Sequence, residues 1–205
     1  MKVNTSTLAN LTRIGSVMLI VGAGLMDLGA VAHLPFVESL GNAGAALAGL
    51  GLIALPFGLR ASGIGGDSRW VAPGIVALLL GIGVTSLVDV PAIFDPTNLA
   101  AGQTFGPVGL VLLSAGFLLW FAAIHKAGSL SGWRKWIFLL AGLWFVLTFP
   151  TIQLPLFVVP FGRPSFLLLA GAHGVAMLLM GKIIRERAES QSATGLLGAS
   201  SFHPR

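Results

Sequence analysis

Long apolar stretches alternate with short polar segments along nearly the whole chain. A helix needs about 20 mostly apolar residues to cross a hydrocarbon core of about 30 Å. Six stretches meet this requirement, at 14–34, 40–59, 70–92, 105–124, 133–158 and 164–184. The pattern therefore predicts an all-α fold, a polytopic integral membrane helical bundle of six transmembrane helices that occupies residues 1–187 and is surrounded by the lipid bilayer.

Composition agrees with this interpretation. Hydrophobic residues make up 55% of the 205 residues and charged residues only 9%, whereas soluble domains carry about 25% charged residues. The absence of cysteine excludes disulfides, thiolate metal sites and cysteine nucleophiles. After residue 187 the chain is rich in Ser, Ala and Gly without an apolar period, which predicts a disordered cytoplasmic tail over 188–205.

The basic residues predict the orientation of the bundle. If six helices alternate, eleven of the twelve basic residues fall on one side of the membrane, and only Arg163 falls on the other. Cytoplasmic loops carry such an excess of Lys and Arg, so both termini are expected in the cytoplasm of a protein of the plasma membrane. The same residues are scattered singly between apolar runs, which argues against a nucleic-acid partner despite the net charge of +5.

The first stretch allows a second interpretation. Basic residues precede it, and Ala30, Val31 and Ala32 form an A-x-A pattern typical of signal-peptide cleavage. The run stays apolar through Leu34, long enough to cross the membrane. The sequence favours a retained helix and leaves cleavage open.

Small residues recur at the same spacing in the even-numbered stretches and indicate a weak internal repeat. The matched positions are Gly41, Gly44, Leu47 and Gly51; Gly106, Gly109, Leu112 and Gly116; and Gly162, Ser165, Leu168 and Ala172. Such ladders let another helix approach closely. They are compatible with three repeated αα-hairpins, although the 28 glycines make chance matches easy.

Two titratable residues are predicted deep inside the bundle. A rise of 1.5 Å per residue places Asp27 about 10 Å and His173 about 14 Å below the outer edge. Ionisable residues at membrane depth are costly and usually mark function. We therefore expect Asp27 and His173 to meet in the outer half, either as a structural ion pair or as a proton or substrate site.

Further polar residues lie nearer the outer rim. Asp89, Gln153 and His33 extend the candidate site toward its mouth, and Pro150 and Pro155 flank Gln153. Interrupted helices beside polar side chains are typical of transporter binding sites. The simpler interpretation is that Pro ends helices at the interface and that Asp89 is merely solvated.

Metal, cofactor and enzyme interpretations have weaker support. Haem held by His33 and His173, or copper held by His173, Met177 and Met180, fits the spacing, but methionine on a helix face is usually packing material. A carboxylate pair of Asp27 and Asp89 is weakened by a depth difference of about 5 Å, and no G-x-S-x-G motif occurs. We assign no catalytic residue, cofactor or metal.

Two functions of different class remain. The first is a small transporter or proton-coupled carrier with its polar site in the outer half of the bundle. The second is a non-catalytic membrane subunit or assembly factor, whose Gly-rich helix faces pack against a membrane protein partner or a second copy in a homo-oligomer.

Overall fold

The computed structural model describes residues 4–95, 100–151, 158–159 and 163–200. Its α-helices are α1 (Thr5–Ala32), α2 (Pro35–Leu52), α3 (Ala54–Ala61), α4 (Val71–Phe94), α5 (Ala100–Ala127), α6 (Trp136–Thr151) and α7 (Ala172–Ser200). A short 3-10 helix, η1 (Gly132–Lys135), precedes α6, and a π-helix, η3 (Leu167–Gly171), precedes α7. Between α6 and η3, the two-residue strands β1 (Val158–Val159) and β2 (Arg163–Pro164) pair antiparallel.

The predicted all-α membrane bundle is confirmed. Within the described chain, five helical segments are long and apolar enough to cross a membrane, α2 and α3 counting together as one. The described part of α6 is 16 residues long, a little short of a full crossing. Large apolar side chains such as Phe36, Leu50 and Leu87 are 70–74% exposed, as expected for surfaces that face lipid.

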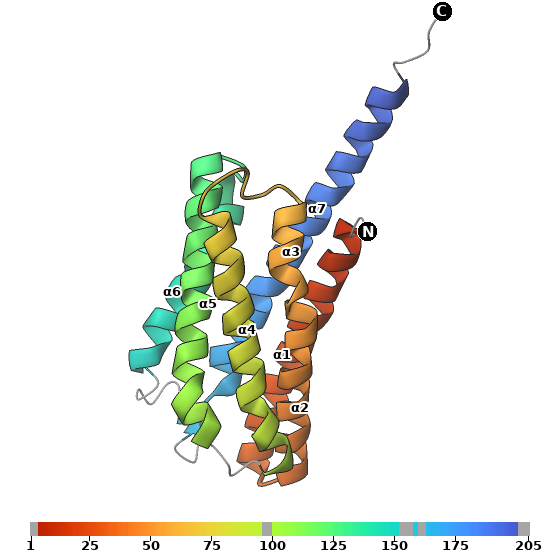
Figure 1. Cartoon of the computed structure of the whole chain (residues 1–205). Coiled ribbons are helices and arrows are strands. Elements are labelled where there is room, and N and C mark those ends of the chain that lie inside the picture. Colours follow the sequence, from red (N-terminus) through yellow and green to blue (C-terminus); the bar gives the residue numbers. More distant parts are fainter. Residues whose placement is uncertain (1–3, 96–99, 152–157, 160–162, 201–205) are drawn as a thin grey trace, which may run out of the picture.

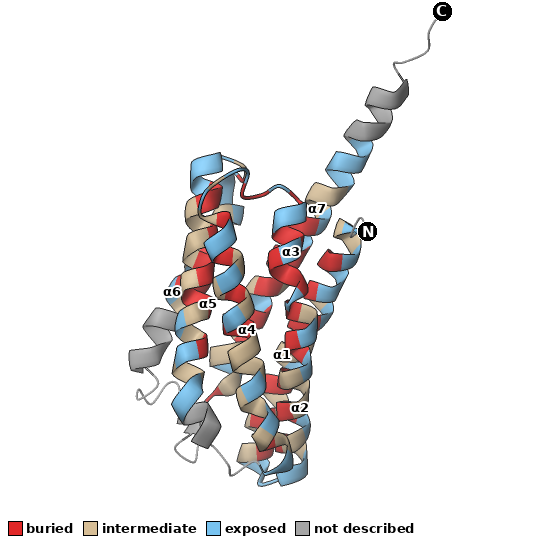
Figure 2. Ribbon diagram, viewed as in Figure 1, coloured by how far each residue is buried: buried red, intermediate tan, exposed pale blue. Residues whose placement is uncertain are grey.

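The helices pack in a closed circuit. Each helix lies along the next in the order α1, α2, α4, α5, α6 and α7, and α7 returns to α1 (Figure 1). The start of α1 and the end of α7 lie at the same end of the bundle (Figure 1), as an even number of crossings requires. Buried residues lie where helices face one another, and exposed residues lie on the outside (Figure 2).

The second predicted stretch is divided into α2 and α3, and a proline explains the break. Pro56 has no amide hydrogen, and its ring clashes with the carbonyl four residues earlier, at Leu52. The long helix accordingly ends at Leu52, and α3 resumes at Ala54.

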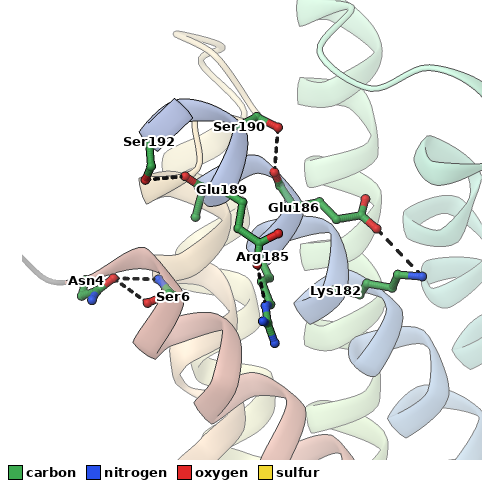
Figure 3. A network of polar contacts seen from close by, with 9 residues as sticks. Asn4, Ser6, Lys182, Arg185, Glu186, Glu189, Ser190 and Ser192 are labelled. Carbon is green, nitrogen blue, oxygen red and sulfur yellow. Dashed lines mark hydrogen bonds and ion pairs between the residues drawn. The ribbon is translucent and has the colours of Figure 1, made fainter. Parts of the chain in front are cut away.

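The last helix, α7, continues to Ser200. Its exposed surface carries ion pairs at i,i+4 spacing, between Lys182 and Glu186 at 3.9 Å and between Arg185 and Glu189 at 2.8 Å (Figure 3). Such pairs stabilise a helix by a few tenths of a kcal/mol each.

Most glycines of the first two ladders pack inside the chain, although Gly106 has no neighbour within 4 Å. A Cβ on Gly22 would lie 2.8 Å from the carbonyl oxygen of Gly41 on α2, and a Cβ on Gly116 would lie 2.9 Å from the amide nitrogen of Leu78 on α4. The pairs α1–α2 and α4–α5 therefore form close-packed hairpins. The expected third hairpin differs, because α6 packs mainly on α5 and α7 mainly on α1.

The two ends of the bundle differ in charge. We call the end formed by residues 60–70, 126–135 and 182–191 the basic end, and the end formed by residues 27–42, 85–95 and 163–169 the acidic end. The apolar core extends from the basic end to the middle of the bundle and includes Leu55, Leu78, Phe117, Trp120, Phe138, Met180 and Ile184. The acidic end buries mainly small and polar residues, among them Glu38, Asn42 and Ser165.

Candidate polar site at the acidic end

Asp27 on α1 holds the beginning of the last helix. Its carboxylate accepts hydrogen bonds from the Ser165 hydroxyl at 2.7 Å, the Phe166 amide at 2.8 Å and the Leu167 amide at 3.1 Å. The first amides of a helix have no partner within that helix, and its N-terminus favours negative charge. Asp27 therefore acts as a cap supplied by a neighbouring helix.

Ser165 completes this cap. Its hydroxyl oxygen accepts from the Leu168 amide at 3.3 Å, and its carbonyl oxygen accepts from the Leu169 amide at 3.1 Å. Together with the two amides bound by Asp27, all four amides from 166 to 169 have an acceptor. Ser is a preferred N-cap residue, so the start of this helix could have been predicted at Ser165. The small-residue spacing predicted only that Ser165 belongs to a ladder on which another helix packs.

His173 has a different set of partners. It is 2% exposed, with Nδ1 at 2.7 Å from the carbonyl oxygen of Leu169 and Nε2 at 3.3 Å from that of Ala141 on α6. No hydrogen bond or ion pair joins Asp27 to His173 among the described residues. From Ser165 to His173 the helix rises about 12 Å. The structure therefore places these residues at separate levels, one on the α1 interface and the other on the α6 interface.

Asp89 on α4 points toward the interior of the bundle. It lies about two turns from Ile82 on the same helix face, and Ile82 and Leu78 belong to the buried core. Thr85 lies against Gly109 on α5 and Ser86 against Gly49 on α2, so Asp89 projects between those two directions. The carboxylate is half-buried, and within the described chain it has no hydrogen bond or ion pair.

Two buried polar residues of α2 lie near this face. Asn42 is 3% exposed and donates through Nδ2 to the carbonyl oxygen of Glu38 at 3.0 Å and to that of Ala92 at 3.2 Å. The helical partner of Ala92 would be the amide of residue 96, which is a proline and has none. Asn42 thus supplies the missing donor. Glu38 is also buried, at 8% exposure.

The remaining predicted residues are His33, Gln153, Pro150 and Pro155. His33 is the exposed C-cap of α1, with a left-handed φ of 54°. Gln153 and Pro155 lie outside the described residues, and the side chain of Pro150 is not described.

The described residues give little support to the predicted haem and copper sites. Both ring nitrogens of His173 face carbonyl oxygens, and Met177 and Met180 are packed in the apolar core. Among the residues that the structure describes, no three His, Cys, Asp or Glu side chains are grouped to hold a metal ion.

The candidate site therefore consists of Asp89 with Thr85, Asn42 and Glu38 around the ends of α2 and α4. On the side of the basic end it meets the apolar core at Ile82 and Leu113. Such a carboxylate can accept a proton or bind a small cation. No protein-family model, curated protein or solved structure matches the chain.

Proposed function

We propose that this multi-pass membrane protein is a small proton-coupled carrier and that Asp89 is its proton-binding group. The observation that carries the proposal is a half-buried carboxylate on the core-facing side of α4, without a hydrogen bond or ion pair in the described chain. A carboxylate at membrane depth costs several kcal/mol unless it is compensated. A proton, a cation or water that enters from the acidic end would provide the compensation.

The distribution of polar and apolar residues supports a site that is open toward one side. Polar residues such as Asn42 and Thr85 surround the level of Asp89, whereas the buried core begins at Ile82, about two turns deeper. In this proposal the core closes the pathway at rest, and a rearrangement of the hairpins exposes Asp89 to the other side. Alternating access of this kind is the general mode of secondary transporters.

The basic end is assigned to the cytoplasm in this proposal, because it carries eight of the twelve Lys and Arg residues, whereas the acidic end carries only Arg163. Asp89 then lies in the outer half of the bundle, and both termini are cytoplasmic in the plasma membrane. Asp27 and His173 are positioning residues here, since Asp27 binds the start of the last helix and His173 contacts α6.

The competing function, a subunit or assembly factor, receives less support. It requires glycine faces that partner helices can cover, but Gly41, Gly44 and Gly51 already contact α1, and Gly109 and Gly116 contact α4. A partner or a second copy would have to use other surfaces of the bundle.

The test is proton uptake by liposomes that contain the purified protein. A potassium diffusion potential set by valinomycin drives protons inward, and an internal pH dye reports their entry. We expect wild type to acidify the lumen, Asp89→Asn to reduce the initial rate at least tenfold and Asp89→Glu to restore part of it. The control is Asp67→Asn, which changes an exposed carboxylate at the basic end and should transport like wild type.

Two results would overturn the proposal. One is wild-type protein that admits no more protons than empty liposomes under this potential. The other is Asp89→Asn protein that transports at the wild-type rate.

A further inference from the structure

We infer that Asp27 and Ser165 form a proton-sensitive latch that docks the first turns of the last helix, residues 165–171, onto α1. Ionised Asp27 holds these turns in place, and protonation of Asp27 releases them while the rest of α7 stays packed. The inference concerns a movable part of the fold and does not depend on the identity of the transported solute or on the role of Asp89.

The hydrogen bonds that dock this segment converge on one side chain. Among the described residues, the hydrogen bonds between residues 165–171 and α1 all end on the carboxylate of Asp27. At Gly24 on α1 this segment leaves open space, because a Cβ there would meet only the Leu167 Cδ1 atom, at 4.0 Å. Leu167 and Leu168 are 45% and 42% exposed.

The continuation of the helix is held in a different way. A Cβ on Gly174 would lie 2.6 Å from Ile20 Cγ1 and 3.0 Å from the carbonyl oxygen of Ser16 on α1. Two turns further along α7, a Cβ on Gly181 would lie 2.8 Å from Arg13 Cγ and 3.3 Å from the carbonyl oxygen of Ala9. Glycine packing of this closeness holds two helices together by backbone contact and does not require an ionised side chain. The contrast locates a boundary between residues 171 and 174.

The backbone at this boundary is already irregular. Residues 167–171 form a π-helix, and the structure returns to α-helix at Ala172. Single-turn π-helices are rare and often mark functional positions, and Gly171 adds conformational freedom. His173 bonds the carbonyl oxygen of Leu169 at 2.7 Å, so a side chain on the fixed part of α7 contacts the movable part.

The protonation state of Asp27 controls the strength of the cap. An ionised carboxylate has acceptor sites on both oxygens and serves three donors here, including two amides at a helix N-terminus. A protonated carboxyl carries a donor O–H on one oxygen and no charge to complement the helix dipole. Protonation therefore weakens the bonds to the Phe166 and Leu167 amides, which have no other acceptor in the cap.

Other charged groups belong to the elements packed around Asp27, and the test has to separate them. They are Glu38 on α2, His33 at the end of α1, His173 on α7 and Arg163 in β2. Glu38→Gln, His33→Gln and His173→Gln each remove one titrating group. If the latch depends on Asp27, its response to pH persists in each of these variants.

Because the sequence contains no cysteine, a single cysteine can be introduced for spin labelling without replacing any other residue. Leu168→Cys places a label on the movable segment. Val175→Cys on α7, beyond the π-helix, is the control of matched exposure, since the side chains of Leu168 and Val175 are 42% and 48% exposed. We expect Asp27→Asn to increase label mobility at position 168, with Ser165→Ala having a smaller effect. Neither variant should change the mobility at position 175.

A pH titration completes the experiment. In the otherwise unchanged chain, the label at position 168 should become mobile as the pH falls, whereas in Asp27→Asn it should be mobile at every pH. Equal mobility at position 168 with and without Asp27→Asn would overturn the latch, and so would equal loosening at positions 168 and 175. Asp89→Asn should leave the labels unaffected, so failure of the latch and failure of the carrier proposal give different results.

Discussion

The two ends of the bundle handle charge in opposite ways. At the basic end, charged side chains are numerous and exposed, as in the pair of Arg134 and Glu186, whose side chains are 45% and 36% exposed. At the acidic end they are few, and although Asp95 is exposed, Asp27 and Asp89 are half-buried and Glu38 is only 8% exposed. A charged side chain that stays in water costs little free energy, whereas a buried charged side chain needs a compensating partner. The acidic end is therefore where charge indicates function.

The polar contacts of the two ends differ as well. At the basic end they join loops, because Arg187 donates to the carbonyl of Ser129, whose hydroxyl donates to the carbonyl of Ile64. At the acidic end they complete helix termini, as Asn42 does for Ala92. The first kind stabilises connections that the apolar core already positions. The second kind sets where helices begin and end beside the candidate site.

The largest effect on stability is expected from the apolar core. Phe117→Ala removes a ring that is 0% exposed and should lower the free energy of unfolding by about 3–5 kcal/mol. Leu140→Ala is the control, since Leu140 is 65% exposed. Unfolding by SDS titration in mixed micelles measures the free energy of unfolding of both variants. If Phe117→Ala lowered the free energy of unfolding no more than Leu140→Ala does, burial in the apolar core would not be the main source of stability.

A smaller effect is expected where α1 meets the beginning of α2. A Cβ on Gly29 would lie 2.5 Å from the amide nitrogen of Glu38 and 2.9 Å from its Cα atom. Gly29→Ala must displace this backbone and should cost about 1–3 kcal/mol. At Gly83 a Cβ has no neighbour within 4 Å, so Gly83→Ala should be stabilising by up to about 1 kcal/mol. Equal effects in the same unfolding assay would contradict the predicted close contact.

The comparison also shows which features were readable from the sequence. Hydropathy predicted the helical membrane bundle, because lipid requires each crossing to satisfy its own backbone hydrogen bonds. Depth counting placed Asp27 and His173 at similar levels, but a one-dimensional count does not contain the direction of a side chain or its partner. Asn42 was missed because its task arises from Pro96, a residue of a different helix hairpin.

The side-chain bonds between helices permit a finer test. Asn42→Ala leaves the Ala92 carbonyl without a donor and should cost about 1 kcal/mol, within the range for hydrogen bonds between membrane helices. Ser114 donates to the carbonyl oxygen of Gly142 at 2.9 Å, but that carbonyl lies inside α6 and keeps its helical amide. Ser114→Ala should therefore cost less than Asn42→Ala. The reverse order in SDS unfolding would refute the explanation based on residue 96.

The smallest effect is expected at the surface of the basic end. Glu186 approaches Arg134 at 3.0 Å and Lys182 at 3.9 Å, and all three side chains are at least one-third exposed. Exposed ion pairs contribute about 0–1 kcal/mol and weaken as salt rises. Glu186→Gln should thus change the free energy of unfolding by less than about 1 kcal/mol at low salt and by still less in 1 M salt. Proton uptake by liposomes should be unchanged. A large loss of uptake would mean that the basic end takes part in transport, and charge burial would then no longer separate the functional end of the bundle from the structural one.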